Sequence, residues 1–154
     1  LLERFNVIKG FFPVAEETGC HGSRGAKEEF FNNVGYAIQF DSTENDTMSL
    51  SLMGTQLFEQ DSEFFNKTKG LILEHGFTEW RHHPYTDTMV LKERFNFSCL
   101  NFAAGYYNYH SDNEYVIVED VLNSTLLGES VIKKLGNKFY EFKVIKKDSF
   151  SWFD

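Results

Sequence analysis

Residues 34–41 read VGYAIQFD, a run of strand-forming residues that ends on a carboxylate. Valine, tyrosine, isoleucine and phenylalanine favour extended backbone, and the polar residues that follow Asp41 indicate a loop. The segment therefore predicts a strand that carries Asp41 at its carboxyl end. In α/β proteins ligands gather at such strand ends, which makes Asp41 a candidate site residue.

Strand and helix signals alternate on either side of this segment. Strands are expected over residues 7–15, 48–58, 97–107 and 139–145, and helices over residues 26–33 (with Ser23 as a cap), 62–74 and 118–135. The last helix is the clearest, because apolar residues recur at helical spacing and Gly136 ends it. Residues 77–88 (FTEWRHHPYTDT) are polar and aromatic, and are expected to form a loop. The pattern predicts an α/β fold, with a mixed, mainly parallel sheet flanked by helices on both faces.

The composition narrows the class of protein. At 154 residues, with 42% hydrophobic and 25% charged residues, residues 1–154 are expected to form a single globular domain. The net charge of -8 argues against a nucleic-acid partner, because phosphate binding depends on clustered Lys and Arg. No apolar run approaches the roughly 20 residues that cross a bilayer, so no membrane partner is expected.

The two cysteines, Cys20 and Cys99, are too few for a disulfide framework and lack the CxxC spacing. They are expected to be buried thiols. Together with the absence of a visible signal peptide, the low cysteine content favours the cytoplasm.

Residues 15–24 read AEETGCHGSR and place two adjacent carboxylates, Glu16 and Glu17, ahead of a glycine-containing loop. Hydrolytic zinc sites need His and carboxylate ligands, an open position for water, and a carboxylate that takes the proton of the water. One member of the pair could act as that base while the other binds the metal. The pair alone is a weak signal, because adjacent glutamates are common on protein surfaces.

The order of such features along the chain is more specific. AEETGCHGSR resembles the Glu-Glu-x-Gly-x-x-Gly-Ser segment of the di-zinc aminopeptidases and related metallo-exopeptidases. Residues 39–43 (QFDST) resemble the strand end that carries the family's Asp ligand, and residues 109–116 (YHSDNEYV) resemble its final His-Ser-x-x-Glu segment. The resemblance spans about residues 7–135. It implies a zinc exopeptidase-like fold, with Glu16 as general base and with zinc ligands Glu17, Asp41 and His110.

The resemblance also indicates which branch of the family fits best and which residues would contact the substrate. The interval between the Asp and His ligands is too short for the inserted domain of the carboxypeptidase and peptidase T branches, so the aminopeptidase branches fit better. Residues 86–88 (TDT) resemble a pair that precedes a substrate-facing loop. By this resemblance the substrate pocket contains Asp87, His83, Tyr85 and, as a weaker candidate, His82. The alternative for these residues is an exposed polar loop.

The family's other metal residues, a His-x-Asp pair and a bridging Asp, precede the Glu-Glu motif, but residues 1–14 contain neither His nor Asp. The chain is therefore expected to be the carboxyl-terminal part of a catalytic domain. The remaining ligands would come from a preceding segment or a partner chain, and activity would depend on them. The resemblance implies one or two zinc ions and a peptide substrate. It is also compatible with assembly into a homo-oligomer.

Three functions remain open at this point. The first is hydrolysis of terminal peptide bonds by zinc-activated water, with Glu16 as base. The second is a related zinc enzyme that cyclises amino-terminal glutamine with similar ligands. The third is an inactive exopeptidase-like binding or structural module, for which an aromatic content of 17% would suit an interface.

Overall fold

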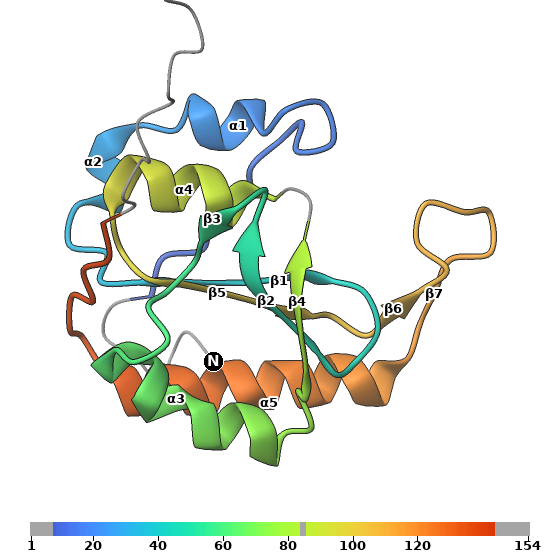
Figure 1. Cartoon of the computed structure of the whole chain (residues 1–154). Coiled ribbons are helices and arrows are strands. Elements are labelled where there is room, and N and C mark those ends of the chain that lie inside the picture. The colour runs from blue at the N-terminus through green and yellow to red at the C-terminus, as the bar shows by residue number, and fades with distance from the viewer. Residues whose placement is uncertain (1–7, 84–85, 144–154) are drawn as a thin grey trace, which may run out of the picture.

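A mixed five-stranded sheet forms the centre of the computed structural model, which describes residues 8–83 and 86–143 (Figure 1). Its strands lie side by side in the order β1 (Ala37–Ser42), β5 (Cys99–Ala103), β2 (Thr47–Leu52) and β4 (Glu79–His83), and the short β3 (Thr55–Gln56) forms a hairpin with β2. The two longer ladders, β1 with β5 and β2 with β4, are parallel. Strand β2 runs antiparallel to β5 and β3, so the sheet is mixed as predicted.

Helices cover both faces of this sheet (Figure 1). On one face lie α3 (Glu63–Glu74) and α5 (Val118–Leu135), and on the other lie α1 (His21–Arg24), α2 (Glu28–Phe31) and α4 (Asp87–Phe95). The predicted α/β class is therefore confirmed. Within the described residues, no helix combines the length and apolar composition that crossing a membrane requires.

The core is centred on β5, whose five residues are all buried. A strand covered on both faces has an apolar sequence with little alternation, and CLNFA fits this pattern apart from Asn101. Phe102 is 0% exposed, and its ring lies 6.0 Å from that of Phe40 and 5.3 Å from that of Phe77. Cys20 and Cys99 are buried, as the sequence predicted.

The two long helices follow from local sequence signals. α5 has the predicted bounds, and Leu127, Val131 and Leu135 are among its buried residues. α3 begins where the Ser62 hydroxyl accepts a hydrogen bond from the Phe65 N–H at 3.3 Å. It ends at the predicted boundary before residues 75–76.

The strand predicted over residues 7–15 is wrong in its described part, because residues 8–15 form no strand. Pro13 cannot donate to a ladder, and Phe11 places its ring 5.6 Å from that of Phe30 and 5.2 Å from that of Phe31. This segment therefore packs against α2 through aromatic side chains. The helix predicted over residues 26–33 is correspondingly short and comprises only Glu28–Phe31.

Two further predictions fail because they depend on pairing between distant segments. Residues 77–88 were expected to form a loop, but they contain β4 and the start of α4. The polar segment from Glu79 to His83 becomes a strand because it pairs with the edge of β2. In the described part of the strand predicted over residues 139–145, only an isolated bridge between Phe97 and Glu141 forms.

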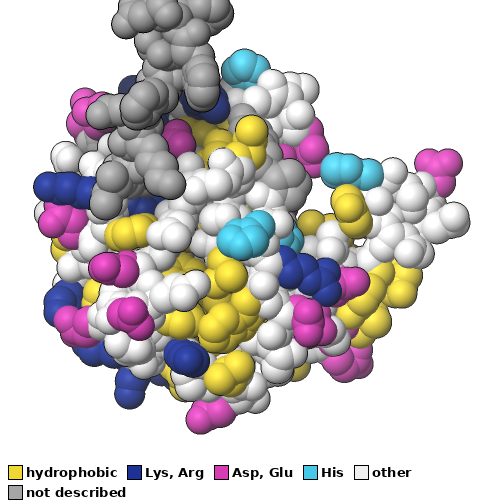
Figure 2. Space-filling view, viewed as in Figure 1, with side chains coloured by type: hydrophobic (Ala, Val, Ile, Leu, Met, Phe, Trp, Pro, Cys, Tyr) yellow, Lys and Arg dark blue, Asp and Glu magenta, His cyan; other side chains and the backbone are white. Residues whose placement is uncertain are grey.

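A small hairpin extends from the body of the protein. It consists of β6 (Tyr106–Tyr107) and β7 (Tyr115–Val116), paired antiparallel, and its turn contains His110. It projects beside the main sheet in Figure 1, and the space-filling view of Figure 2 shows it standing clear of the surface behind it. The hairpin therefore holds His110 away from the central sheet.

Candidate active site

The adjacent glutamates lie on a tight loop that precedes α1. Within it, the Gly19 N–H donates to the Glu16 carbonyl at 3.0 Å, and the Gly22 N–H donates to the Val14 carbonyl at 2.9 Å. A Cβ at Gly22 would lie 2.5 Å from the Val14 nitrogen, so this close approach requires glycine. Ala15 has a φ of 56°, a strained value for a residue with a side chain. The hydrogen bonds thus hold the backbone of Glu16 in one position.

Asp41 lies near the carboxyl end of β1, as predicted. Its N–H donates to Asn101 Oδ1 at 3.2 Å, and its Oδ2 accepts from Gln39 Nε2 at 3.1 Å. The fully buried Asn101 side chain also donates to the hydroxyls of Ser42 and Ser49, at 3.1 and 3.0 Å. This network joins β1, β5 and β2, and it fixes the strand end that carries Asp41.

Gln39 connects the same strand end to the start of α4. Its Oε1 accepts from the Thr86 hydroxyl at 2.9 Å, and from the Thr88 N–H and hydroxyl at 3.1 and 2.6 Å. Asp87 lies between these threonines and is 6% exposed. Its Oδ1 accepts from the Ser23 hydroxyl at 2.5 Å. Ser23 was expected to cap a helix, but it lies inside α1 and instead binds this buried carboxylate.

His110 reaches the glutamates from the turn of the β6–β7 hairpin. Its φ of 57° is in the left-handed region, and its N–H donates to Glu114 Oε2 at 3.2 Å. The imidazole Nε2 lies 3.1 Å from Glu17 Oε1, although the two residues are 93 positions apart. Their side chains are 67% and 73% exposed, so this pair lies at the surface.

Four carboxylates from three segments interact electrostatically at this place. Burial, followed by the charges of Asp41, Glu17 and Asp87, raises the pKa of Glu16 to about 7, and the charge of His110 opposes this shift. Burial, followed by the charges of Asp87 and Glu17, raises the pKa of Asp41 to about 6. Because like charges here destabilise one another, a cation bound among them would be favoured.

The donor set has the chemistry of a zinc site, but the described side chains are not arranged as one. Two carboxylates and an imidazole are ligands that zinc accepts. Across residues 8–83 and 86–143, however, no group of three His, Cys, Asp or Glu side chains lies close enough to hold an ion. Glu17 and His110 contact each other, whereas Asp41 is hydrogen-bonded to Gln39. To complete the coordination sphere of a zinc ion, these side chains would have to move or additional ligands would have to be supplied.

The predicted substrate-facing residues separate in space. Asp87 lies among the carboxylates, and its charge raises the pKa values of Glu16 and Asp41. His83 lies at the end of β4, with its Nδ1 3.3 Å from the Ser42 hydroxyl. Burial, with a smaller effect of the Arg81 charge, lowers the pKa of His83 and favours its neutral form.

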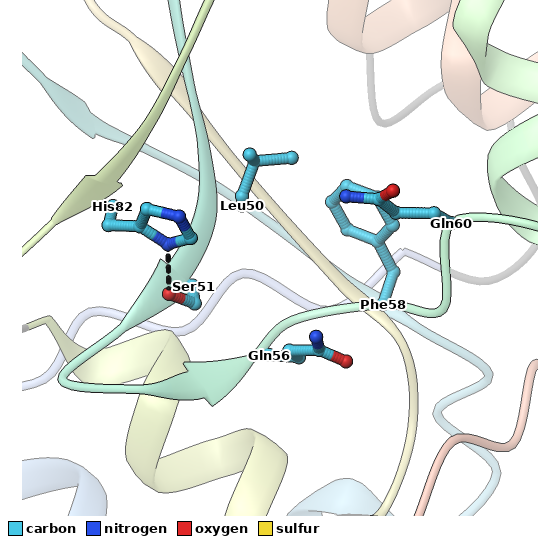
Figure 3. Close-up of a pocket in the computed structure, with 6 residues that line it drawn as sticks. All are labelled: Leu50, Ser51, Gln56, Phe58, Gln60 and His82. Carbon is cyan, nitrogen blue, oxygen red and sulfur yellow. Dashed lines mark hydrogen bonds between the residues drawn. The ribbon is translucent and has the colours of Figure 1, made fainter.

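His82 is directed to a different place from His83. Its Nδ1 lies 2.6 Å from the Ser51 hydroxyl, beside a small cavity of about 30 Å³ (Figure 3). This cavity is also lined by Leu50 and Phe58. Tyr85, the remaining candidate, lies outside the described residues.

Three residues near the cluster were not identified from the sequence. Gln39 and Asn101 position Asp41, and a buried polar residue inside the apolar strand CLNFA was a usable signal for Asn101. Tyr106 interacts electrostatically with the same acidic cluster. Burial, followed by the charges of Asp41 and Glu114, raises its pKa to about 12. No local pattern marks Tyr106, because its position depends on the hairpin.

Comparison with known proteins gives no relative for this chain: no family model, no curated protein and no solved structure matches it.

Proposed function

We propose that this chain is the carboxyl-terminal part of the catalytic domain of a zinc-dependent exopeptidase of the aminopeptidase type, with a zinc exopeptidase-like fold. The observation that carries the proposal is the contact between His110 and Glu17, which are 93 positions apart, beside a Glu16 carboxyl on which the charges of Asp41, Glu17 and His110 act. The motif resemblance rests on sequence order alone. The contact between two of the same side chains in space is therefore separate support.

Glu16 is the proposed general base. A base is most effective when its pKa lies near the working pH, and burial together with neighbouring charges raises the pKa of Glu16 to about 7. In the proposed reaction its carboxylate takes a proton from the attacking water and later gives it to the leaving amine. The hydrogen-bonded loop fixes the backbone position from which the Glu16 side chain extends.

The proposed zinc ligands are Glu17, Asp41 and His110, completed by residues of a preceding segment or a partner chain. Zinc would polarise the scissile carbonyl and increase the acidity of water. Asp41 must lose its proton to bind metal, and its pKa is raised to about 6, so zinc affinity should increase as the pH rises from 5 to 8. Asp87 and His83 are the proposed substrate-side residues.

Zinc titration calorimetry at pH 7.5 of the chain together with the completing segment tests the metal site. We expect stoichiometric binding, and a loss of affinity of about tenfold or more in His110→Ala. His82→Ala is the matched control, because the His82 side chain contacts Ser51, away from the proposed ligands. The zinc affinity of this variant should stay within about twofold of that of the natural protein. Absence of zinc binding, or equal binding by both variants, would contradict the proposed ligands.

Hydrolysis of a fluorogenic aminoacyl amide tests the base. In the zinc-loaded protein, together with the completing segment, Glu16→Gln should lower the turnover rate by about 10² to 10⁴ while zinc affinity changes little. Loss of zinc binding in Glu16→Gln would instead identify Glu16 as a ligand. Full turnover in this variant would exclude it as the base.

A second candidate is a binding module that keeps the exopeptidase-like fold without catalysis. It is favoured by one observation, namely that the described side chains contain no group of three placed to hold an ion. The same calorimetry separates the two functions, since a module would be purified without zinc and would take up none.

A further inference from the structure

The two edges of the central sheet differ in chemistry. β4 has the sequence EWRHH, and its Glu79 and Arg81 side chains are exposed. Charged side chains of this kind protect an edge strand from pairing with other chains. At the opposite edge, residues 37–40 of β1 read AIQF and contain neither a charge nor a proline. β1 therefore lacks the protection that β4 has.

Within the described residues, β1 pairs with a single strand, β5. The Ala37 N–H donates to the Ser98 carbonyl at 3.2 Å, which places the backbone groups of Ala37 and Gln39 toward β5. Successive residues of a strand direct these groups to opposite edges, so those of Ile38 and Phe40 face the outer edge. This edge offers two N–H donors and two carbonyl acceptors to a further strand.

This outer edge lies in an apolar groove of about 1140 Å³. The groove is lined by β1 from residue 37 to residue 40 and by apolar side chains of α2, of α5 and of loops beside them, including Phe11, Phe12, Phe30, Ile132 and Phe139. Phe12 is 93% exposed and Phe139 is 53% exposed. Apolar surface of this extent, beside backbone groups that no described strand pairs with, is typical of a site that accepts a polypeptide strand.

Charge distinguishes one end of the groove. Asp87 is part of its lining, and Asp41 follows Phe40 at the carboxyl end of β1. These two carboxylates make this end of the groove acidic. An occupant with a cationic residue at this end would complement the charge, whereas an acidic residue would be repelled.

We propose that β1 pairs with an extended segment of a partner polypeptide that is apolar along the groove and cationic where it passes Asp41. A second copy of this chain fits less well, because two recessed edges facing each other would leave both grooves unfilled. Each copy would also add a net charge of -8. This inference goes beyond the proposed function and does not depend on it.

Amide hydrogen exchange, followed by NMR in the presence of EDTA, tests strand addition without metal or substrate. The probes are two synthetic peptides of alternating valine and threonine, one ending in two lysines and the other in two glutamates. In the chain alone, the Ile38 and Phe40 amides should exchange freely, and the lysine peptide should slow them at least tenfold. The glutamate peptide should protect them less, and a lysine peptide N-methylated at alternate amides should give no protection.

Two variants, one inside the groove and one outside it, test whether the peptide binds in the groove. Phe12→Ser should weaken binding of the lysine peptide at least threefold, because Phe12 lines the groove. Met53→Ser removes a side chain that is 68% exposed, at the β2–β3 turn and outside the groove lining, and should leave binding unchanged.

Four outcomes would overturn the inference. Protection of both amides in the dilute chain alone would mean that the edge is already covered, and protection that grows with protein concentration would identify a second copy. Equal protection by the N-methylated peptide would mean apolar adhesion without strand pairing. Shortening of the peptide, detected by mass spectrometry, would identify the groove as a substrate site. Failure of zinc binding would leave these results unaffected, so the two proposals can fail separately.

Discussion

At the residue scale, the acidic cluster is held together at a cost in stability. Glu16 and Asp41 have raised pKa values because burial and neighbouring carboxylates disfavour their charged forms. Functional sites often retain such unfavourable charges, since ligand binding relieves them. The cost should therefore be measurable in the protein without ligand.

Glu16→Gln should change how stability depends on pH. The pKa of Glu16 is about 7 in the folded protein and 4.5 for the free side chain, so the folded state binds more protons between these values. Stability therefore falls as pH rises through this window. Relative to Glu16→Gln, the natural protein should lose about 1 kcal/mol between pH 5 and pH 8, less than the full shift because solvent screens the carboxyl.

Urea denaturation at the two pH values gives this difference. Glu74→Gln is the matched control, because Glu74 is an exposed carboxylate at the end of α3. This variant controls for the loss of one surface carboxylate. A Glu16→Gln variant with the pH dependence of the natural protein would show that Glu16 titrates normally.

Asn101→Ala tests the network that positions Asp41. The substitution leaves the Asp41 N–H without its acceptor and removes the amide that donates to the hydroxyls of Ser42 and Ser49. Buried polar groups without partners are costly, so we expect a loss of about 2–3 kcal/mol in the free energy of unfolding. Ser49→Ala removes only the hydroxyl that contacts Asn101 and Ser42, and should cost about 1 kcal/mol. Equal losses in both variants would mean that the amide is not the centre of the network.

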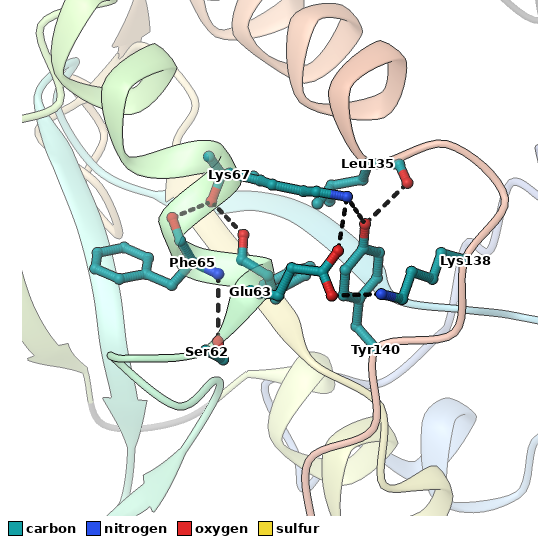
Figure 4. Close-up of polar contacts among 9 residues, drawn as sticks. Ser62, Glu63, Phe65, Lys67, Leu135, Lys138 and Tyr140 are labelled. Carbon is teal, nitrogen blue, oxygen red and sulfur yellow. Dashed lines mark hydrogen bonds and ion pairs between the residues drawn. The ribbon is translucent and has the colours of Figure 1, made fainter.

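At the element scale, the first turn of α3 connects the helix to the segment that follows α5. The Glu63 carboxylate pairs with Lys67 at 2.8 Å and also with Lys138, and the Lys67 ammonium donates to the Tyr140 hydroxyl at 3.4 Å (Figure 4). Hydrogen bonds from Lys138 and Lys67 lower the pKa of Glu63 to about 2. Because these groups are at the surface, packing and the helix cap should stabilise the helix more than its ion pairs do.

Ser62→Ala should therefore destabilise the protein by about 1 kcal/mol, because it removes the hydroxyl that accepts from the Phe65 N–H (Figure 4). Ser62→Asp, which keeps an acceptor at the cap, should stay within a few tenths of a kcal/mol of the natural protein. Thermal unfolding followed by circular dichroism measures both changes. If Ser62→Asp is as unstable as Ser62→Ala, the cap is not the cause.

At the scale of the whole molecule, stability depends on the core between the sheet and its helices. Phe102→Ala removes a fully buried ring that contacts Phe40 and Phe77, and should cost about 3–5 kcal/mol. A domain of this size is stable by roughly 5–15 kcal/mol, so this loss would be a large share of the total. Phe139→Ala removes the same kind of ring from the surface and should change stability by at most about 0.5 kcal/mol. Urea unfolding midpoints compare the two variants.

The sequence by itself determined the elements whose signals are local. Helical periodicity with a glycine stop gave α5, and Ser62 with residues 75–76 gave both ends of α3. Strand-forming residues followed by a polar loop gave β1, although it begins at Ala37 instead of residue 34. These features are specified by residues a few positions apart, so composition and spacing were sufficient to predict them.

Only the tertiary structure decided the features that depend on distant residues. The polar β4 segment becomes a strand because β2 offers it an edge, and residues 8–15 do not because they pack against α2. His110 meets Glu17 across 93 positions only because the hairpin reaches the glutamate loop. The raised pKa of Glu16 likewise depends on burial and on charges from other segments, and no pattern within residues 15–24 contains that information.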